Sequence, residues 1–144
     1  MTNPKWPKEI ERGLIPTDNA MGIMTTELSP AAEAFISHAR QAQRPLLEVG
    51  AAYGNATLPA LGTGATVIAN DLSLTELAVL AESAPAGSHR HLVLAPARFP
   101  QELKLGEGSL SGVLYCISSR ARRWSFPSRV FTDGSNQAAS SSCS

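Results

Sequence analysis

One stretch of the chain decides the fold: Leu46-Leu47-Glu48-Val49-Gly50-Ala51-Ala52-Tyr53-Gly54-Asn55. It begins with a short apolar run that is typical of a strand buried on both faces of a parallel sheet. Gly50 and Gly54 follow, and they predict a tight turn because glycine adopts backbone conformations that other residues disfavour. A second apolar run, residues 65–69, is followed shortly by Asp71. The pattern predicts two strands connected through a glycine turn and a short helix.

A glycine turn at the carboxyl end of a strand suits a nucleotide-type cofactor. Small residues let ligand atoms approach the backbone and the next helix, and Asp71 is a candidate acceptor for two ribose hydroxyls. A dinucleotide fingerprint needs glycine at the first, third and sixth positions of the turn, where this chain has Gly50, Ala52 and Asn55. A phosphate-binding P-loop would need Gly-Lys-Ser/Thr at its end, which the residues after Gly54 do not supply. A nicotinamide dinucleotide is therefore a weak candidate for the cofactor, and a P-loop is excluded.

What remains is an acidic residue two places before the first glycine and a second glycine four places after it. This resembles motif I of the class I S-adenosylmethionine-dependent methyltransferases, usually acidic-x-Gly-x-Gly-x-Gly, with Ala52 at the middle glycine. The resemblance covers about residues 29–117. It implies S-adenosylmethionine as the cofactor, with the turn facing its methionine part and Asp71 holding its ribose. The residues that it implies for cofactor binding are Glu48, Gly50, Ala52, Tyr53, Gly54, Asp71 and Leu72.

Helices and strands alternate outward from the turn. Ser29-Pro30 predicts a helix start, and Ser73 with Glu76 forms a capping box for a later helix. Strands are expected over residues 46–49, 65–69, 91–94 and 111–117, and helices over 30–42, 55–61 and from 74 to about 84. This order predicts an α/β fold with a three-layer, Rossmann-like, open and mainly parallel sheet, truncated after about four strands. The resemblance implies that the first of these strands lies beside the fourth.

The chain divides into three predicted segments. Residues 1–28 are expected to form an irregular N-terminal arm, and residues 29–117 a partial Rossmann-like methyltransferase domain. Residues 118–144 contain nine serines and a cluster of arginines, which predicts a disordered tail. We interpret this tail as a frame change, an alternative end or gene decay, and its rival reading is an RNA-binding segment. Without a further strand, residues 113–117 would be an exposed sheet edge, which predicts self-association.

The composition bounds the remaining possibilities. The chain has 144 residues, 43% of them hydrophobic and 17% charged, which suits one globular domain. The sequence has neither a membrane span nor the apolar core of a signal peptide, and its two cysteines lie far apart, so a cytoplasmic protein without a membrane partner is expected. Residues 1–117 carry 8 basic and 11 acidic side chains, which disfavours a nucleic-acid partner. His89 and His91 have no third ligand of matching spacing, so no metal is predicted.

The resemblance implies methyl transfer from a sulfonium to an acceptor that the sequence does not identify, and it assigns no catalytic residue. Pro96 stands near the place where the family usually offers an acid to the adenine amino group. The family's later strands have no counterpart after Ile117, so the enzyme is expected to be truncated and of doubtful turnover. The alternative is a noncatalytic relic or interaction protein that keeps the Rossmann-like scaffold. In that case the glycines serve only the turn, and Glu48 and Asp71 are solvated strand ends.

Overall fold

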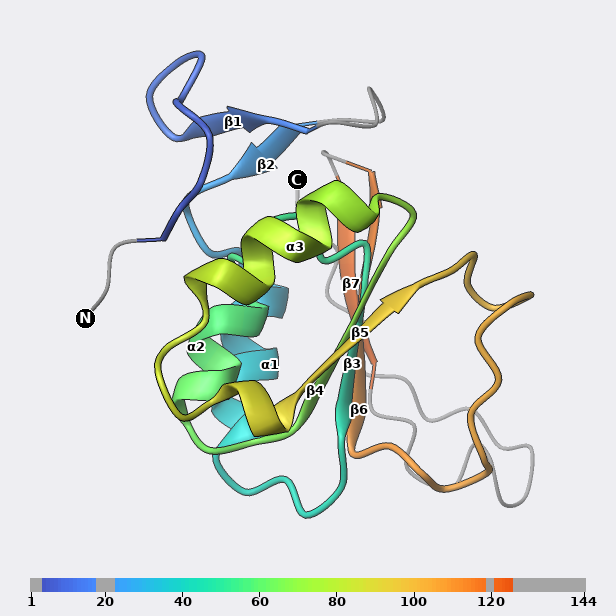
Figure 1. Cartoon of the computed structure of the whole chain (residues 1–144). Helices are drawn as coiled ribbons and strands as arrows, with labels where there is room; N and C mark the ends of the chain where they lie inside the picture. The colour runs from blue at the N-terminus through green and yellow to red at the C-terminus, as the bar shows by residue number, and fades with distance from the viewer. Residues whose placement is uncertain (1–3, 18–22, 119–120, 126–144) are drawn as a thin grey trace.

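The computed structural model describes residues 4–17, 23–118 and 121–125, which form an α/β arrangement (Figure 1). Its strands are β1 (Leu14–Pro16), β2 (Ile23–Thr25), β3 (Leu46–Val49), β4 (Val67–Asp71), β5 (Leu92–Pro96), β6 (Gly112–Ser118) and β7 (Ala121–Ser125). Its helices are α1 (Pro30–Ala39), α2 (Thr57–Gly62) and α3 (Leu74–Ser83), with a 3₁₀ turn η1 (His89–His91). Every helix and strand predicted between residues 30 and 118 is present, with boundaries that differ by no more than about three residues.

The main sheet has the strand order β5-β4-β3-β6-β7. β3 pairs in parallel with β4 on one side and with β6 on the other, and β5 pairs in parallel with β4. The open, mainly parallel sheet is therefore confirmed, including the placement of the first predicted strand beside the fourth. Because the chain moves outward from β3 to β5 and then returns to β6, the strand order reverses beside β3. Ligands of open α/β sheets bind outside the carboxyl ends of the strands at such a reversal.

A further strand, β7, lies antiparallel against β6. The prediction that the sheet stops at residues 111–117 and leaves that strand as an open edge is therefore wrong. The reason is non-local: the backbone groups of β6 find partners in β7, although the composition of this segment predicted disorder. Residues 119–120 and 126–144, the rest of the predicted tail, lie outside the described residues. Among the described strands, the open edge of the main sheet on the other side is β5.

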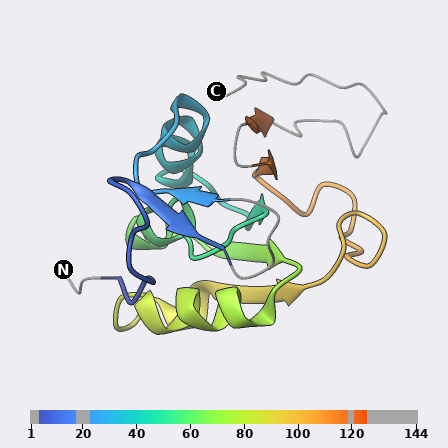
Figure 2. The same cartoon turned by 90° about the horizontal axis from the view of Figure 1, so that it is seen from above.

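Helices α1, α2 and α3, the α-helices of the described residues, cover one face of the main sheet (Figures 1 and 2). On that face Leu46, Val67 and Leu114 pack around Phe35 of α1, and all four side chains are buried. Helix α3 adds Leu77 and Leu80 in a second cluster, together with small residues of β4 and of the glycine turn. The alternation of side chains along each strand assigns every other residue to this helical layer.

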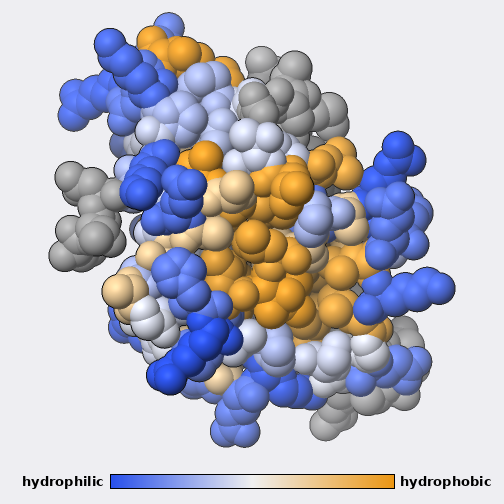
Figure 3. Space-filling model, in the orientation of Figure 1, coloured by the Kyte–Doolittle hydropathy of each residue, from blue (hydrophilic) through white to orange (hydrophobic). Residues whose placement is uncertain are grey.

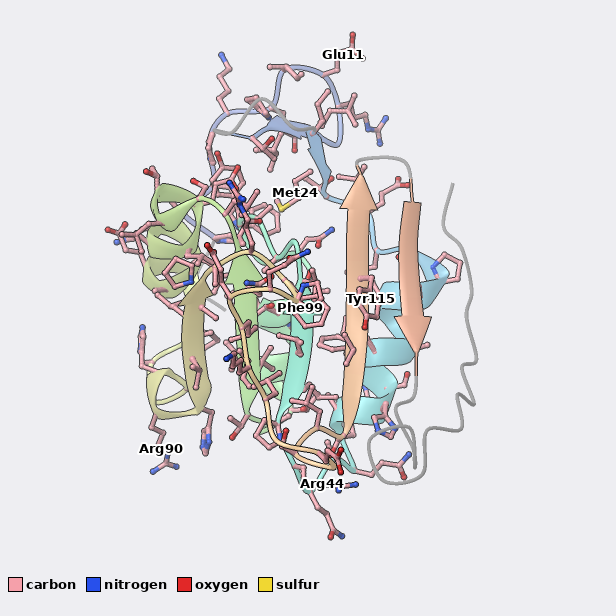
Figure 4. All side chains as sticks on the ribbon, turned by 90° about the vertical axis from the view of Figure 1, so that its right-hand side faces the viewer. Glu11, Met24, Arg44, Arg90, Phe99 and Tyr115 are labelled. Atoms are coloured by element: carbon pink, nitrogen blue, oxygen red, sulfur yellow. The ribbon has the colours of Figure 1, made fainter. Side chains whose placement is uncertain are left out.

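The opposite face of the sheet carries Leu47, Ile68 and Val113, and the irregular segment 97–111 covers them instead of a helix. Figure 4 looks onto this face and shows Phe99 of the segment beside Tyr115 of β6. The ring centroids of this pair are 5.8 Å apart. Burial raises the pKa of the Tyr115 hydroxyl above its ordinary value of 10.0.

The covering segment does not reach all of the apolar surface. Val93 on β5 lies opposite Ile68 in the same row of the sheet, but 47% of its surface is exposed. Figure 3 shows apolar surface in the middle of the molecule, over the region of β5 and α3. Self-association remains a prediction, and the edge strands of the main sheet among the described residues are β5 and β7 rather than β6.

Local signals in the sequence account for the helix starts. Ser29 caps α1, since its hydroxyl oxygen accepts a hydrogen bond from the backbone N–H of Ala32 at 3.0 Å, and Pro30 occupies the first turn. Ser73 caps α3 in the same way, accepting from the backbone N–H of Glu76 at 3.2 Å. None of the described helices combines the length and the apolar character that crossing a membrane requires.

The cap of α3 gives a first testable expectation. Replacing Ser73 with alanine removes an acceptor for an otherwise unsatisfied N–H of the first turn, and should lower the free energy of unfolding by about 1 kcal/mol. Urea denaturation followed by circular dichroism measures this change. Thr75→Ala is the matched control, because Thr75 is an exposed residue of the same turn. A loss in the control as large as that in Ser73→Ala would contradict the capping role.

The N-terminal arm differs from its prediction. Its described residues include an ordered pair of strands, β1 and β2, which run antiparallel with Ile15 opposite Met24. Each strand has three residues, which is too short to show a period in the sequence. The pair lies beyond the carboxyl ends of the main-sheet strands, next to the glycine turn (Figures 1 and 4).

Candidate functional site

The glycine turn connects the end of β3 to α2, and three of its residues have positive φ. Gly50 has φ +77°, Ala52 has φ +48° and Gly54 has φ +88°. The backbone N–H groups of Gly50 and Ala51 both donate to the carbonyl oxygen of Asn70 at 2.9 Å, which fixes the turn to β4. A left-handed conformation at a non-glycine residue such as Ala52 is uncommon and costs free energy. The surrounding contacts must therefore hold Ala52 in place.

Asp71 supplies one of these contacts. This residue ends β4, its surface is 7% exposed, and its Oδ2 accepts a hydrogen bond from the backbone N–H of Ala52 at 2.9 Å. Its Oδ1 accepts from the backbone N–H of Ser73 at 3.0 Å. The structure thus brings Asp71 onto the turn, and its binding of ribose hydroxyls remains a prediction. A carboxylate has about four lone-pair positions, so these two bonds leave acceptor capacity for further donors.

Leu72, the next residue along the chain, is an exposed apolar side chain. More than half of its surface, 56%, is accessible. Because Leu72 directly follows Asp71, an exposed apolar side chain adjoins a carboxylate-bearing residue. Such a pair of residues would suit a nucleoside, whose ribose hydroxyls can donate to the carboxylate and whose base can pack on the apolar side chain. The role of Leu72 in binding remains a prediction.

Glu48 lies beneath the turn rather than on its surface. It shares the helix-facing side of β3 with Leu46, and its surface is fully buried. The hydroxyl of Thr57, in the first turn of α2, donates to Glu48 Oε2 at 2.5 Å. Glu48 therefore links β3 to α2 through this hydrogen bond. The alternative interpretation, in which Glu48 is a solvent-exposed residue at the end of the strand, is wrong. Direct contact of Glu48 with a cofactor remains a prediction.

Tyr53 and Asn55 are held by the N-terminal segment. The hydroxyl of Tyr53 donates to the carbonyl oxygen of Pro16 at 3.1 Å, and its own carbonyl accepts from Trp6 Nε1 at 2.8 Å. Asn55 Nδ2 donates to the carbonyl oxygen of Thr25 at 2.7 Å. Asn55 Oδ1 is buried and has no hydrogen-bond partner within the described part of the chain. Both side chains are almost completely buried.

The sequence interpretation did not include Thr57, Asn55 or Trp6 among the site residues. Thr57 could have been found, because the period of a strand places Glu48 on the same face as Leu46 and requires a buried partner for its carboxylate. Asn55 and Trp6 had no such signal, since their partners are backbone carbonyls far away in the sequence.

Gly54 is required by packing as well as by conformation. A Cβ atom on this residue would lie 2.7 Å from Cγ and 2.9 Å from Cδ1 of Leu80, which is buried in α3. The turn can therefore approach α3 this closely only with glycine at position 54. Within the described ranges, no three His, Cys, Asp or Glu side chains gather in a way that could hold a metal ion.

Comparison with known proteins gives likenesses over part of the chain. No family model matches the chain, and no curated protein sequence matches it. Among solved structures, the glycopeptide N-methyltransferase MtfA complexed with sinefungin is 25% identical, with a TM-score of 0.49 over 60% of this chain and 35% of MtfA. The CcbJ methyltransferase from Streptomyces caelestis is 30% identical, with a TM-score of 0.49 over 59% of this chain and 36% of CcbJ.

A third structure, MtfA complexed with (S)-adenosyl-L-methionine, is 30% identical, with a TM-score of 0.41 over 46% of this chain and 31% of that one. The chain thus spans about a third of the length of the solved structures that it resembles. With TM-scores below 0.5, these likenesses do not decide the function, which depends on the chemistry of the site itself.

Proposed function

We propose that this chain binds S-adenosylmethionine at the glycine turn between β3 and α2, as the cofactor-binding part of a methyltransferase whose acceptor is unknown. The observation that carries the proposal is the bond between Asp71 and the backbone of Ala52. It places a carboxylate with remaining acceptor capacity at the carboxyl ends of two neighbouring strands, beside the reversal of strand order. A ribose, with its pair of adjacent hydroxyls, is the group that such a carboxylate binds.

The residues at the site suit the adenosine part of S-adenosylmethionine. Asp71 would accept from the ribose hydroxyls, and exposed Leu72 would offer an apolar surface to the adenine. When bound, S-adenosylmethionine supplies an electrophilic methyl group on a sulfonium. The chain's own contribution would be to orient that group, because methyl transfer depends mainly on the alignment of the two reactants. We assign no catalytic residue, and Pro96 supplies neither a carboxylate nor an N–H near the expected place of the adenine.

The test is a calorimetric titration of the full chain with S-adenosylmethionine, with NAD as the comparison ligand. We expect S-adenosylmethionine to bind and NAD to give no heat, because the dinucleotide fingerprint is incomplete. At a ligand concentration about 100 times the Kd, binding should stabilise the fold by about 2.7 kcal/mol. This stabilisation corresponds to a rise in Tm of roughly 5–10 °C for a domain of this size.

Failure of S-adenosylmethionine to bind would contradict the proposal. It would favour the alternative of a noncatalytic protein that keeps the scaffold. The burial of Tyr53 and Ala52 beneath the N-terminal segment is the observation that favours this alternative, since a turn that serves only the fold can be fully covered.

A further inference from the structure

The N-terminal residues of the chain make three side-chain hydrogen bonds to the glycine turn. Trp6 Nε1 donates to the carbonyl of Tyr53 at 2.8 Å, and the hydroxyl of Tyr53 donates back to the carbonyl of Pro16 at 3.1 Å. In the third bond, Asn55 Nδ2 donates to the carbonyl oxygen of Thr25 at 2.7 Å. These bonds join residues that are 30 to 47 positions apart in the sequence. They attach both strands of the N-terminal pair, or residues next to them, to the same short turn.

Apolar packing strengthens the attachment. Ile15 and Met24, from the two N-terminal strands, form one buried cluster with Ala52 and Tyr53 of the turn. Trp6 packs against the same cluster. Figure 4 shows Met24 above the carboxyl ends of the main-sheet strands, on the side where the turn lies. The N-terminal segment therefore covers the turn rather than lying elsewhere on the sheet.

The turn is thus held from two sides. Asp71 binds the N–H of Ala52 from the side of β4, and the N-terminal residues bind Tyr53 from the other side. Between these attachments Ala52 keeps a φ of +48°, which an alanine adopts only when its surroundings impose it. If the N-terminal residues lost their contacts with the turn, the strained backbone at Ala52 could change conformation. The turn would then no longer hold its present position beside Asp71.

We propose that residues 4–17 and 23–28 form a strap that positions the glycine turn for its ligand, and that ligand binding in return holds the strap on the turn. The proposal rests on the proposed function, because it concerns the same S-adenosylmethionine site. The coupling is reciprocal by necessity: if the attached strap raises the affinity for the cofactor, the cofactor must favour the attached strap by the same factor. Trp6 is a positioning residue in this scheme, since it acts through the carbonyl of Tyr53.

The first test replaces Trp6 with phenylalanine, which removes the N–H donor and keeps an aromatic ring. Loss of this one hydrogen bond should raise the Kd for S-adenosylmethionine by about two- to tenfold in a calorimetric titration. Ile10→Ala is the matched control from the same segment, because the Ile10 side chain is 57% exposed. The control should leave the Kd unchanged. An unchanged Kd in Trp6→Phe would overturn the positioning role.

The second test measures a property that a merely structural role would not change. Trypsin can cleave after Arg12, an exposed residue of the strap, and after Lys104, an exposed residue of the segment on the other face of the sheet. Saturating S-adenosylmethionine should slow cleavage after Arg12 and leave cleavage after Lys104 unchanged. In Trp6→Phe the protection of Arg12 should be smaller.

The outcomes distinguish the two proposals. If S-adenosylmethionine binds by calorimetry and does not protect Arg12 from trypsin, the strap is refuted and the proposed function stands. If S-adenosylmethionine does not bind, both proposals are overturned. Equal protection of Arg12 and Lys104 would indicate a global gain of stability and would also refute the strap.

Discussion

Replacing Gly54 with alanine is expected to lower the free energy of unfolding by about 2–5 kcal/mol, a large part of the roughly 5–15 kcal/mol that stabilises a typical domain. Two effects add. The φ of +88° disfavours any residue with a Cβ atom by about 1–2 kcal/mol. The added Cβ would also lie 2.7 Å from Cγ of Leu80, which is fully buried, and overpacking of this kind costs about 1–3 kcal/mol.

Two other glycines separate these effects. Gly62, in α2, has no atom near a built Cβ and no positive φ, so Gly62→Ala should be neutral or stabilising by up to about 1 kcal/mol. Gly64 has φ +91° but open space around it, so Gly64→Ala should show the conformational effect alone. Chemical denaturation of the three variants measures the free energy of unfolding of each, and Gly54→Ala should be the least stable, followed by Gly64→Ala and then Gly62→Ala. Destabilisation in Gly54→Ala no greater than that in Gly64→Ala would show that the contact with α3 is not tight.

The parts of the fold that the sequence predicted are those with local physical causes. Ser29 and Pro30 mark the start of α1 through one cap bond and one fixed dihedral angle. The short apolar run at residues 46–49, which ends in a glycine turn, is typical of a strand buried on both faces of a parallel sheet, and it forms β3. Asp71 reaches the turn for a topological reason, since the carboxyl ends of neighbouring parallel strands meet at the same edge of the sheet.

The parts that were missed depend on contacts between distant segments. β7 forms because β6 offers unpaired backbone groups, and nothing in the composition of residues 121–125 indicates this. The N-terminal pair of strands is similar, since its short strands are stabilised by Tyr53 and Ala52 of the turn rather than by their own pattern. Because Glu48 lies near the end of a strand, the sequence predicted that its side chain either contacts the cofactor or is exposed to solvent. Its bond to Thr57 follows instead from the face that it shares with Leu46.

Asp71→Ala is the change with the largest expected effect on the cofactor. Each charge-assisted hydrogen bond from a ribose hydroxyl is worth about 1.5–3 kcal/mol. The variant also removes the acceptor of the Ala52 N–H, so the turn loses one of its hydrogen bonds to β4 and keeps those of Gly50 and Ala51 to Asn70. Since about 1.4 kcal/mol corresponds to a factor of ten, we expect the Kd for S-adenosylmethionine to rise at least tenfold. A calorimetric titration measures this, and an unchanged Kd would remove Asp71 from the site.

Asp71→Asn separates recognition of the ribose from support of the turn. The amide keeps one oxygen that can accept from the N–H of Ala52, but it replaces the other acceptor with a donor and removes the charge. Its fold without ligand should therefore be more stable than that of Asp71→Ala, because one of the two backbone N–H groups keeps its partner. Its Kd should still be raised, since charge-assisted bonds to the hydroxyls are about twice as strong as neutral ones. Equal Kd values for Asp71→Asn and the unmodified chain would mean that the carboxylate serves the turn alone.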